Sequence, residues 1–512
     1  MGFLNVEAAP WLLYDTIIAF SKLRPTRLVC QRIHGVAMRI ELLLSAWLIV
    51  GGLAEQTQRC RLRLIRQGKQ GQPTSERGNI TATATATATA TIESPSTGTT
   101  PSSVPTPNSA PFPPFEYGRD VIRAVNLGGW LVLEPWITPS FFERTNNTDV
   151  IDEWTLGSLV DREAARRMLI QHWETWITED DFIAIRAAGL NHVRIPVGYW
   201  SVPLADEDRS TTVSSEPYIP GAWQYLLRGL NWARKHGLRV IVDLHGAPGS
   251  QNGFDNSGQR TSSPQWALEP DSVAHTVDVL RFIAANVGGM IDILQMLNEP
   301  AGFRGDNWAA VVRQFWLDGH DAVREAAGPN MHVMISDAFL GVNTWTSFLT
   351  PPRADGVLMD FHEYQIFSHP ELDRSLQEHI DFACNYVQTL SAYSSSNLWT
   401  VVGEWSNAIT DCARWLNGRG IGARWDGTYD SDQFHGSCEG YTGSYENFSE
   451  EYRAYLRRYW EAQVEIGEHV QGWIFWTWKA ENADEWSYQR GITGGWIPQD
   501  PTDRIYPDIC TR

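Results

Sequence analysis

Eight short apolar segments, rich in β-branched residues and bounded by turn residues, recur after about residue 115 in this chain of 512 residues. Segments of this length and character form strands that are buried on both faces. The expected strands span residues 121–127, 192–197, 238–244, 291–297, 332–335, 357–361, 398–403 and 470–475. Amphipathic stretches separate most of them, and the clearest span residues 179–188, 222–236, 272–286, 308–327 and 450–466.

This alternation of strands and helices predicts parallel β–α units and an α/β fold class. Eight such units predict one (β/α)8 TIM barrel with long loops over residues 116–512. An open, doubly wound sheet is the alternative, but no glycine-rich nucleotide-binding loop follows the first strand. We therefore expect the barrel.

The first 115 residues differ in composition from the rest of the chain. Residues 81–114 alternate Thr and Ala and then become rich in Ser, Thr and Pro. Because such a composition cannot bury a core, we expect residues 55–115 to form a disordered, low-complexity linker, basic at first and O-glycosylated further on. Sequons at Asn79, Asn146 and Asn447 agree with secretion.

Residues 1–54 contain an apolar run of 13 residues, 42–54. This run is too short to span a bilayer comfortably and suits the apolar core of a signal peptide, for which Met38 is a conventional start. The basic stretch 59–69 disfavours translocation and leaves a type II membrane anchor as the alternative. We expect a secreted protein or, in the alternative case, one attached to the cell surface through its N-terminus.

Charge and cysteine content exclude several classes of protein. The net charge of −19 argues against a nucleic-acid partner, whose phosphates would be repelled. The six cysteines form no CxxC pair, so we expect no metal site. Four cysteines in the C-terminal third predict two disulfides in an oxidising compartment, with three pairings open. The 24 tryptophans either pack the core or offer flat faces to sugar rings.

Polar side chains follow the expected strands at their C-terminal ends, which in a barrel meet at one mouth. Two of them are the acids Glu299 and Glu404, after the fourth and seventh strands. The others are Asn126, Arg194, His245, Asn298, His362, Tyr364 and Trp476. Burying so many polar groups is costly unless they serve one another or a ligand. Paired carboxylates in such a place divide acid/base and nucleophilic roles, as in the cleavage of glycosidic bonds.

Seven motifs carry a resemblance to a known family. In chain order they read VNLGGW (125–130), HVRIP (192–196), DLHGAPGSQNG (243–253), LNEP (297–300), HEY (362–364), GEW (403–405) and WTWK (476–479). Over about residues 116–512 the chain resembles the fungal exo-β-1,3-glucanases of glycoside hydrolase family five. Glu363 stands where His is more usual in that pattern. Strand alternation puts Glu363 on the face opposite His362 and Tyr364, which predicts a structural role.

The resemblance implies a retaining mechanism without a cofactor, in which Glu299 is the general acid/base and Glu404 the nucleophile. A raised pKa would keep Glu299 protonated, and donors such as Arg194 and Tyr364 would keep Glu404 ionised. The other implied substrate contacts are Asn298 at the 2-hydroxyl, His245 and His362 at hydroxyls or carboxylates, Trp476 beneath the sugar, Glu134 and Asp255 at the terminal glucose, and Phe254 and Phe367 as an aromatic clamp at the entrance.

The expected function is the release of terminal glucose from β-1,3-glucan by a monomeric enzyme of the cell wall or its surroundings. A β-1,6-glucanase or a broad β-glucosidase is the nearest alternative. A non-catalytic glucan-binding wall protein is a further one, although the presence of both glutamates argues against it. The resemblance also implies the disulfides Cys384–Cys510 and Cys412–Cys438, the second of which would close a loop at the rim of the mouth.

Overall fold

The computed structural model describes residues 113–204, 216–430 and 433–511. Within these ranges the strands are β1 (Ile122–Asn126), β2 (His192–Gly198), β3 (Arg239–Gly246), β4 (Ile293–Gln295), β5 (His332–Ser336), β6 (Val357–Glu363), β7 (Trp399–Trp405) and β8 (Gly472–Phe475). The α-helices are α2 (Pro139–Glu143), α3 (Glu153–Leu159), α4 (Arg162–Thr175), α5 (Glu179–Ala187), α6 (Trp223–His236), α7 (Pro270–Val287), α8 (Asp306–Ala327), α9 (His369–Leu372), α10 (Leu376–Ser396), α11 (Glu450–Glu468) and α12 (Tyr488–Gly494). The eight predicted strands and the five predicted helices are all confirmed, with differences of a few residues at their ends.

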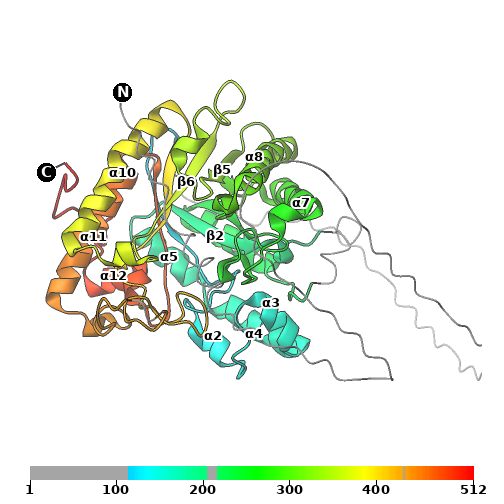
Figure 1. The fold of residues 1–512 in the computed structure, drawn as a ribbon. Helices are drawn as coiled ribbons and strands as arrows, with labels where there is room; N and C mark the ends of the chain where they lie inside the picture. The colour runs from blue at the N-terminus through cyan, green and yellow to red at the C-terminus, as the bar shows by residue number, and fades with distance from the viewer. Residues whose placement is uncertain (1–112, 205–215, 431–432, 512) are drawn as a thin grey trace, which may run out of the picture. The chain divides into compact units, whose positions relative to one another are not determined.

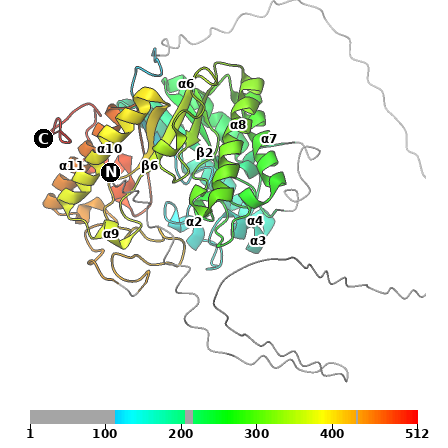
Figure 2. The same cartoon turned by 45° about the horizontal axis from the view of Figure 1, so that its top comes forward.

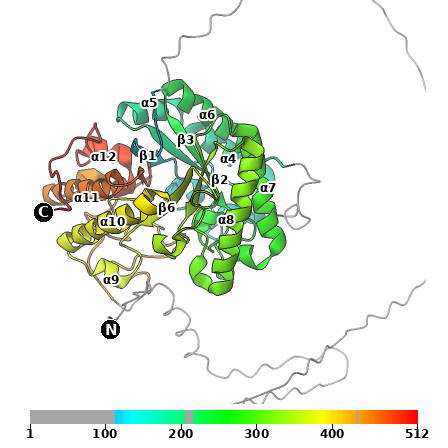
Figure 3. The same ribbon diagram turned by 90° about the horizontal axis from the view of Figure 1, so that it is seen from above.

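The strands close into one barrel in chain order, and every neighbouring pair is parallel. Figure 1 shows the strands inside a ring of helices, and Figure 3 shows α5, α6, α7, α8, α10 and α11 around them. In Figure 2 the helices inserted after β1, which are α2, α3 and α4, lie together at one end of the barrel. The predicted (β/α)8 barrel is therefore confirmed.

The inside of the barrel changes from apolar to polar along the strand direction. Its base is an apolar layer made by Ala124, Ile241, Ile293, Met334, Leu358, Val401 and Ile474, on which Phe115 and Tyr117 pack. Two residues further along four of these strands stand Asn126, Asp243, Gln295 and Asp360, none of which is exposed. Because side chains two residues apart share a face of a strand, these polar groups form the next layer inside the barrel.

Local sequence signals begin and end the helices. The side chain of Ser375 accepts a hydrogen bond from the backbone N–H of Glu378 and so caps the N-terminus of α10. Helix α6 ends at Gly237, whose φ of +71° is a left-handed conformation that glycine adopts without strain. Such signals set the lengths of the helices that cover the strands.

Both predicted disulfides are present. Cys384–Cys510 joins α10 to the C-terminal segment, and Cys412–Cys438 closes a loop after β7. Disulfides indicate an extracellular, oxidising compartment. In the part of the chain that the structure describes, no helix has the length and apolar character needed to cross a membrane. The expected signal or anchor (1–54) and nearly all of the linker (55–115) lie outside the described residues.

Candidate active site

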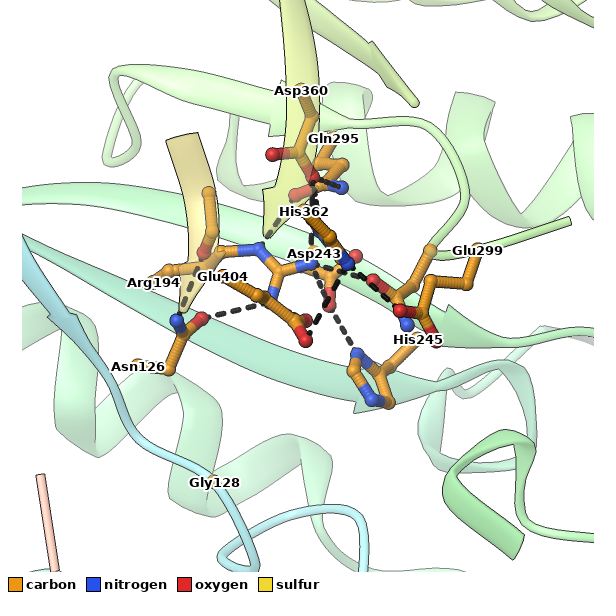
Figure 4. A network of polar contacts seen from close by, with 12 residues as sticks. Asn126, Gly128, Arg194, Asp243, His245, Gln295, Glu299, Asp360, His362 and Glu404 are labelled. Atoms are coloured by element: carbon orange, nitrogen blue, oxygen red, sulfur yellow. Dashed lines mark hydrogen bonds and ion pairs between the residues drawn. The ribbon is translucent and has the colours of Figure 1, made fainter. Parts of the chain in front are cut away.

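The two predicted acids meet at the C-terminal mouth of the barrel (Figure 4). Glu299 follows β4, and Glu404 belongs to the end of β7. One oxygen of each carboxylate and one ring nitrogen of His362 lie within 4.8 Å of one another. Carboxyl groups roughly 5–5.5 Å apart suit retention, whereas inversion needs roughly 6.5–9.5 Å to admit a water molecule. Nearest oxygens no more than 4.8 Å apart fit the narrower spacing of a retaining pair.

The backbone at Glu299 is strained. Its φ of +45° lies in the left-handed region, which non-glycine residues adopt rarely and at a cost of about 1–3 kcal/mol. Gln251 holds this turn, because its side-chain amide donates to Asn298 O at 3.0 Å and its backbone oxygen accepts from Ala301 N at 3.0 Å. Strain that persists under such support is characteristic of an active site.

Arg194, from β2, is the centre of the polar layer beneath the two acids (Figure 4). Its guanidinium donates to Glu404 Oε1 at 2.8 Å and lies 3.2 Å from the carboxylate of Asp243. A buried cation of this kind persists only when opposite charges and hydrogen bonds compensate it. Its remaining acceptors are Asn126 Oδ1 at 2.7 Å, Gln295 Oε1 at 2.7 Å and Asn298 Oδ1 at 2.8 Å.

His362, on β6, connects the two acids to the polar layer. Its Nδ1 lies 2.8 Å from Glu299 Oε1 and 3.5 Å from Glu404 Oε2, and its Nε2 lies 2.9 Å from Asp360 Oδ2. Burial alone would lower the pKa of His362, but the negative charges of Glu404 and Asp360 hold it well above its usual range. The surrounding carboxylates therefore favour the charged, doubly protonated form of the His362 ring.

The pKa values of the two glutamates differ from the prediction. Burial favours neutral Glu299, but the hydrogen bond and charge of His362 outweigh burial and lower the pKa of Glu299. Burial raises the pKa of Glu404, although His362 and Arg194 act against that shift. Tyr364 donates to Glu404 at 3.1 Å, as expected of a donor to the nucleophile. The predicted raised pKa of Glu299 is wrong, because a charged histidine and not a second anion is its hydrogen-bonded neighbour.

Buried polar atoms at the mouth that make no hydrogen bond within the described residues include Asn298 Nδ2, His245 Nε2 and Asp255 Oδ2. Asp243 fixes the His245 ring through Nδ1 at 2.6 Å, and the ring stacks on Trp476 at 5.6 Å between centroids with 10° between planes. Unpaired polar atoms that line the mouth are available to a polar ligand such as a hydroxylated sugar.

The predicted residues for the terminal glucose also lie near the two acids. Glu134 is 5% exposed and accepts a hydrogen bond from the indole of Trp136 at 2.9 Å. Burial, and after it the charge of Asp255, raises the pKa of Glu134 well above its usual range. Burial likewise raises the pKa of Asp255 to about 7. Burial therefore favours the neutral, hydrogen-bonding form of both Glu134 and Asp255.

The two phenylalanines of the expected clamp lie on loops after different strands. Phe254, after β3, is 42% exposed and contacts Phe339 edge-on at 6.5 Å between ring centroids. Phe367, after β6, contacts Tyr364 at 5.7 Å. An exposed Phe at the mouth has an apolar face that a sugar ring can cover.

The sequence reasoning missed several residues of the site. Asn256 donates to Glu299 Oε2 at 3.1 Å, and Gln295 donates to Asp360 at 2.6 Å. Asp243 and Asp360 each orient the histidine that follows two residues later on the same strand. The signal for both was the period of two in a strand, which puts such a pair on one face. Asn256 directly follows Asp255, which the family resemblance did single out.

A β-bulge sets the direction of Glu404. Between β6 and β7 the register pairs Phe361 with Val402 and then His362 with Glu404, so that Gly403 has no partner. A Cβ atom on Gly403 would lie 1.8 Å from Asp360 Oδ1. The glycine is therefore required by space, and the bulge turns Glu404 toward the mouth.

A parallel eight-stranded barrel with two buried glutamates at its mouth has the arrangement of a glycoside hydrolase of the two-carboxylate kind. The chain belongs to glycosyl hydrolase family 5, because the model of the cellulases of that family matches residues 161–417.

Relatives that are named for their activity agree with this membership. A glucan 1,3-beta-glucosidase of Blumeria graminis is 41% identical over 404 residues, which cover 77% of this chain and 91% of the relative. One from Schwanniomyces occidentalis is 42% identical over 406 residues, covering 77% and 92%. Among solved structures, a rutinosidase from Aspergillus niger superposes with a TM-score of 0.58 at 20% identity, covering 75% of this chain and 99% of that one. This last likeness supports the fold alone.

Proposed function

We propose that the protein is a retaining exo-acting glucan 1,3-β-glucosidase that releases terminal glucose from β-1,3-glucan of the cell wall. The observation that carries the proposal is the buried pair Glu299 and Glu404, whose nearest oxygens fit double displacement. Two relatives at 41% and 42% identity bear this activity in their names. The protein acts outside the cell, in agreement with its disulfides, and as a monomer.

Glu404 attacks the anomeric carbon and forms the glycosyl-enzyme, and Glu299 protonates the leaving oxygen. Arg194 and Tyr364 hold one oxygen of Glu404 each, which aims the carboxylate before attack. The free Nδ2 of Asn298 donates to the 2-hydroxyl, where the hydrogen bond strengthens as charge develops on the sugar.

The proton for the leaving oxygen is shared between His362 and Glu299, which are hydrogen-bonded at 2.8 Å. When substrate enters and displaces water, the proton moves along this hydrogen bond to Glu299, the carboxylate that faces the leaving sugar. After departure of that sugar, the lowered pKa of Glu299 suits its second role as the base that activates water.

Glu134 and Asp255 close the far side of the pocket, so that the enzyme accepts only the end of a chain. Trp476 supports the terminal glucose from below, while Phe254 and Phe367 bracket the sugar that leaves. His245 contributes its free Nε2 to a hydroxyl of the same glucose.

The test is Glu404→Gln with laminarin as substrate. We expect turnover to fall by about 10⁴-fold or more while laminarin binding, measured by titration calorimetry, stays within a few-fold of wild type. Persistent turnover would refute the role of Glu404. A chelator such as EDTA should leave wild-type activity unchanged, and its loss would contradict a mechanism of two carboxylates alone.

The nearest alternative is a β-1,6-glucanase or a broad β-glucosidase. Rates on laminarin, on a β-1,6-glucan and on a small aryl β-glucoside separate the three, since the proposal expects laminarin to have the highest kcat/KM. A glucan-binding protein without activity would turn over none of them.

A further inference from the structure

The start of helix α3 contacts the loops that follow three successive strands of the barrel. Residues 152–154, with Asp152 as the N-cap, form hydrogen bonds to the loops after β1, β2 and β3. Glu134 lies on the first of these loops, and Asp255 and Asn256 lie on the third. None of residues 152–154 has a role in the mechanism above.

Glu153 bridges the first two loops with one carboxylate. Its Oε1 accepts the backbone N–H of Leu133 at 2.8 Å, and its Oε2 accepts the indole N–H of Trp200 at 3.0 Å. Leu133 directly precedes Glu134, so this hydrogen bond fixes the backbone from which Glu134 projects. Glu153 is 3% exposed, so no water replaces these contacts cheaply.

Trp200, which Glu153 holds through its indole N–H, packs in turn against the third loop. A Cβ atom on Gly198, Gly246 or Gly258 would lie 2.3, 2.6 or 2.2 Å from atoms of the Trp200 ring. The ring therefore rests directly on bare backbone at the ends of β2 and β3 and after the short helix η4 (Asp255–Ser257). Tyr218 stacks on Trp200 at 4.3 Å between ring centroids.

The neighbours of Glu153 in sequence also hold the loop that contains η4. The backbone N–H of Trp154 donates to Gly258 O at 2.9 Å, and Asp152 Oδ2 accepts from Arg260 N at 2.6 Å. Gly258 is the residue that ends η4. The turn that carries Asp255 is thus fastened at its C-terminal end by two contacts besides the Trp200 ring.

We propose that Glu153 is a positioning residue for the closed end of the glucose pocket, which holds Glu134 and Asp255 at the spacing that one terminal glucose requires. This inference rests on the proposed function, because it assigns the two acids to that glucose. Glu153 touches no substrate, and it acts through Leu133 N–H and the Trp200 indole. Burial raises the pKa of Glu153 to about 7, and the hydrogen bonds from Leu133 and Trp200 act against that rise.

The test compares Glu153→Gln with Glu461→Gln in the full-length protein. A glutamine amide nitrogen donates and cannot accept a hydrogen bond. In Glu153→Gln it would therefore lie against the N–H of either Leu133 or Trp200, and that hydrogen bond would be lost. We expect KM for 4-nitrophenyl β-D-glucoside, a substrate that needs only the glucose pocket and a small leaving group, to rise about tenfold with kcat within about threefold of wild type.

Glu461→Gln is the control for the loss of a buried carboxylate, because Glu461 is also buried and accepts the backbone N–H groups of Ile505 at 2.9 Å and Tyr506 at 2.6 Å. It also accepts from Arg457 Nε at 2.5 Å, so its loss should cost at least as much stability. This control should lower the melting temperature and leave KM unchanged. A folded Glu153→Gln with KM within twofold of wild type would overturn the proposal, and so would an equal rise in KM in the control.

Trp200→Phe covers the case in which Glu153→Gln does not fold. It keeps a ring on the three glycines and removes only the indole N–H and part of the ring, and KM should again rise while kcat changes little. An unchanged KM would also overturn the proposal.

A wild-type protein that cleaves the aryl glucoside but not laminarin refutes the glucan assignment alone, and one that cleaves neither refutes both.

Discussion

The two faces of strand β6 each bury one acid, and the two acids differ in protonation: one is charged and the other is close to neutral. On the inner face Asp360 lies 2.9 Å from His362 and 3.9 Å from Arg194. Burial alone would raise the pKa of Asp360, but these two charges hold it below its usual range. On the outer face Glu363 accepts hydrogen bonds from the amides of Gln365 and Gln463, and burial raises its pKa to about 7.

Burial is nearly equal on the two faces, at 0% exposure for Asp360 and 3% for Glu363. The difference lies in the partners, because a cation stabilises the charged form of an acid and an amide does so only weakly. Asp360 inside the barrel is therefore charged and lies next to the catalytic groups, whereas Glu363 on the helix-covered face is close to neutral.

The strongest way to disturb the inner face is Gly403→Ala. The new Cβ would lie 1.8 Å from Asp360 Oδ1, so Asp360 or the bulge must move, and Glu404 moves with the bulge. We expect kcat/KM to fall by on the order of 10³-fold, since misplacement of a catalytic group by about 1 Å costs about 10² or more.

Gly289→Ala is the matched control, because a Cβ there has nothing within 4 Å. It should retain wild-type kcat/KM and melting temperature. A folded Gly403→Ala with activity near that of the control would show that the inner face has more room than the structure indicates.

A smaller disturbance is Asp360→Asn, which removes one of the two negative charges that raise the pKa of His362. His362 would then lose its proton at a lower pH, so the alkaline limb of the pH profile of kcat/KM should move to lower pH. We expect a fall in kcat of on the order of tenfold to a hundredfold at the wild-type optimum. An unshifted alkaline limb would contradict the proton sharing between His362 and Glu299.

The smallest effect on activity is expected from Glu363→Gln. Because the folded pKa of Glu363 is raised from 4.5 to about 7, its favourable contribution is complete below pH 4.5 and is lost as pH rises through 7. That loss amounts to on the order of 3 kcal/mol. The melting temperature of the variant, relative to wild type, should therefore increase from pH 5 to pH 8, with kcat/KM unchanged at each pH.

Thermal scans at several pH values and initial rates on laminarin check this prediction. A melting-temperature difference that does not change with pH would show that Glu363 is already ionised when buried. A loss of activity would show that the outer face of β6 takes part in positioning His362.

The sequence sufficed for the barrel because each buried strand is a short apolar run with a clear end. It was less accurate for β4, which the apolar pattern extends over 291–297 although only Ile293–Gln295 pair as a strand. Side chains such as Met296 and Leu297 are buried by the core without belonging to the strand, so burial and not pairing determined the pattern.

For the site, the sequence identified the residues that lie in long motifs. It did not identify the residues and backbone features that position them. The bulge at Gly403 depends on how β7 pairs with β6, which no single segment encodes. The pKa of Glu299 depends on the placement of His362 between two acids that are 105 residues apart in sequence, and only the folded structure shows this placement. The same holds for Glu153, whose two partners belong to different loops.

The most direct test of the central claim is the configuration of the first glucose released from laminarin, followed by proton NMR before mutarotation. The pair of Glu299 and Glu404 predicts retention, so β-glucose should appear first and the α anomer should grow only at the rate of mutarotation. Initial release of α-glucose would mean inversion and would contradict the assignment of Glu404 as nucleophile.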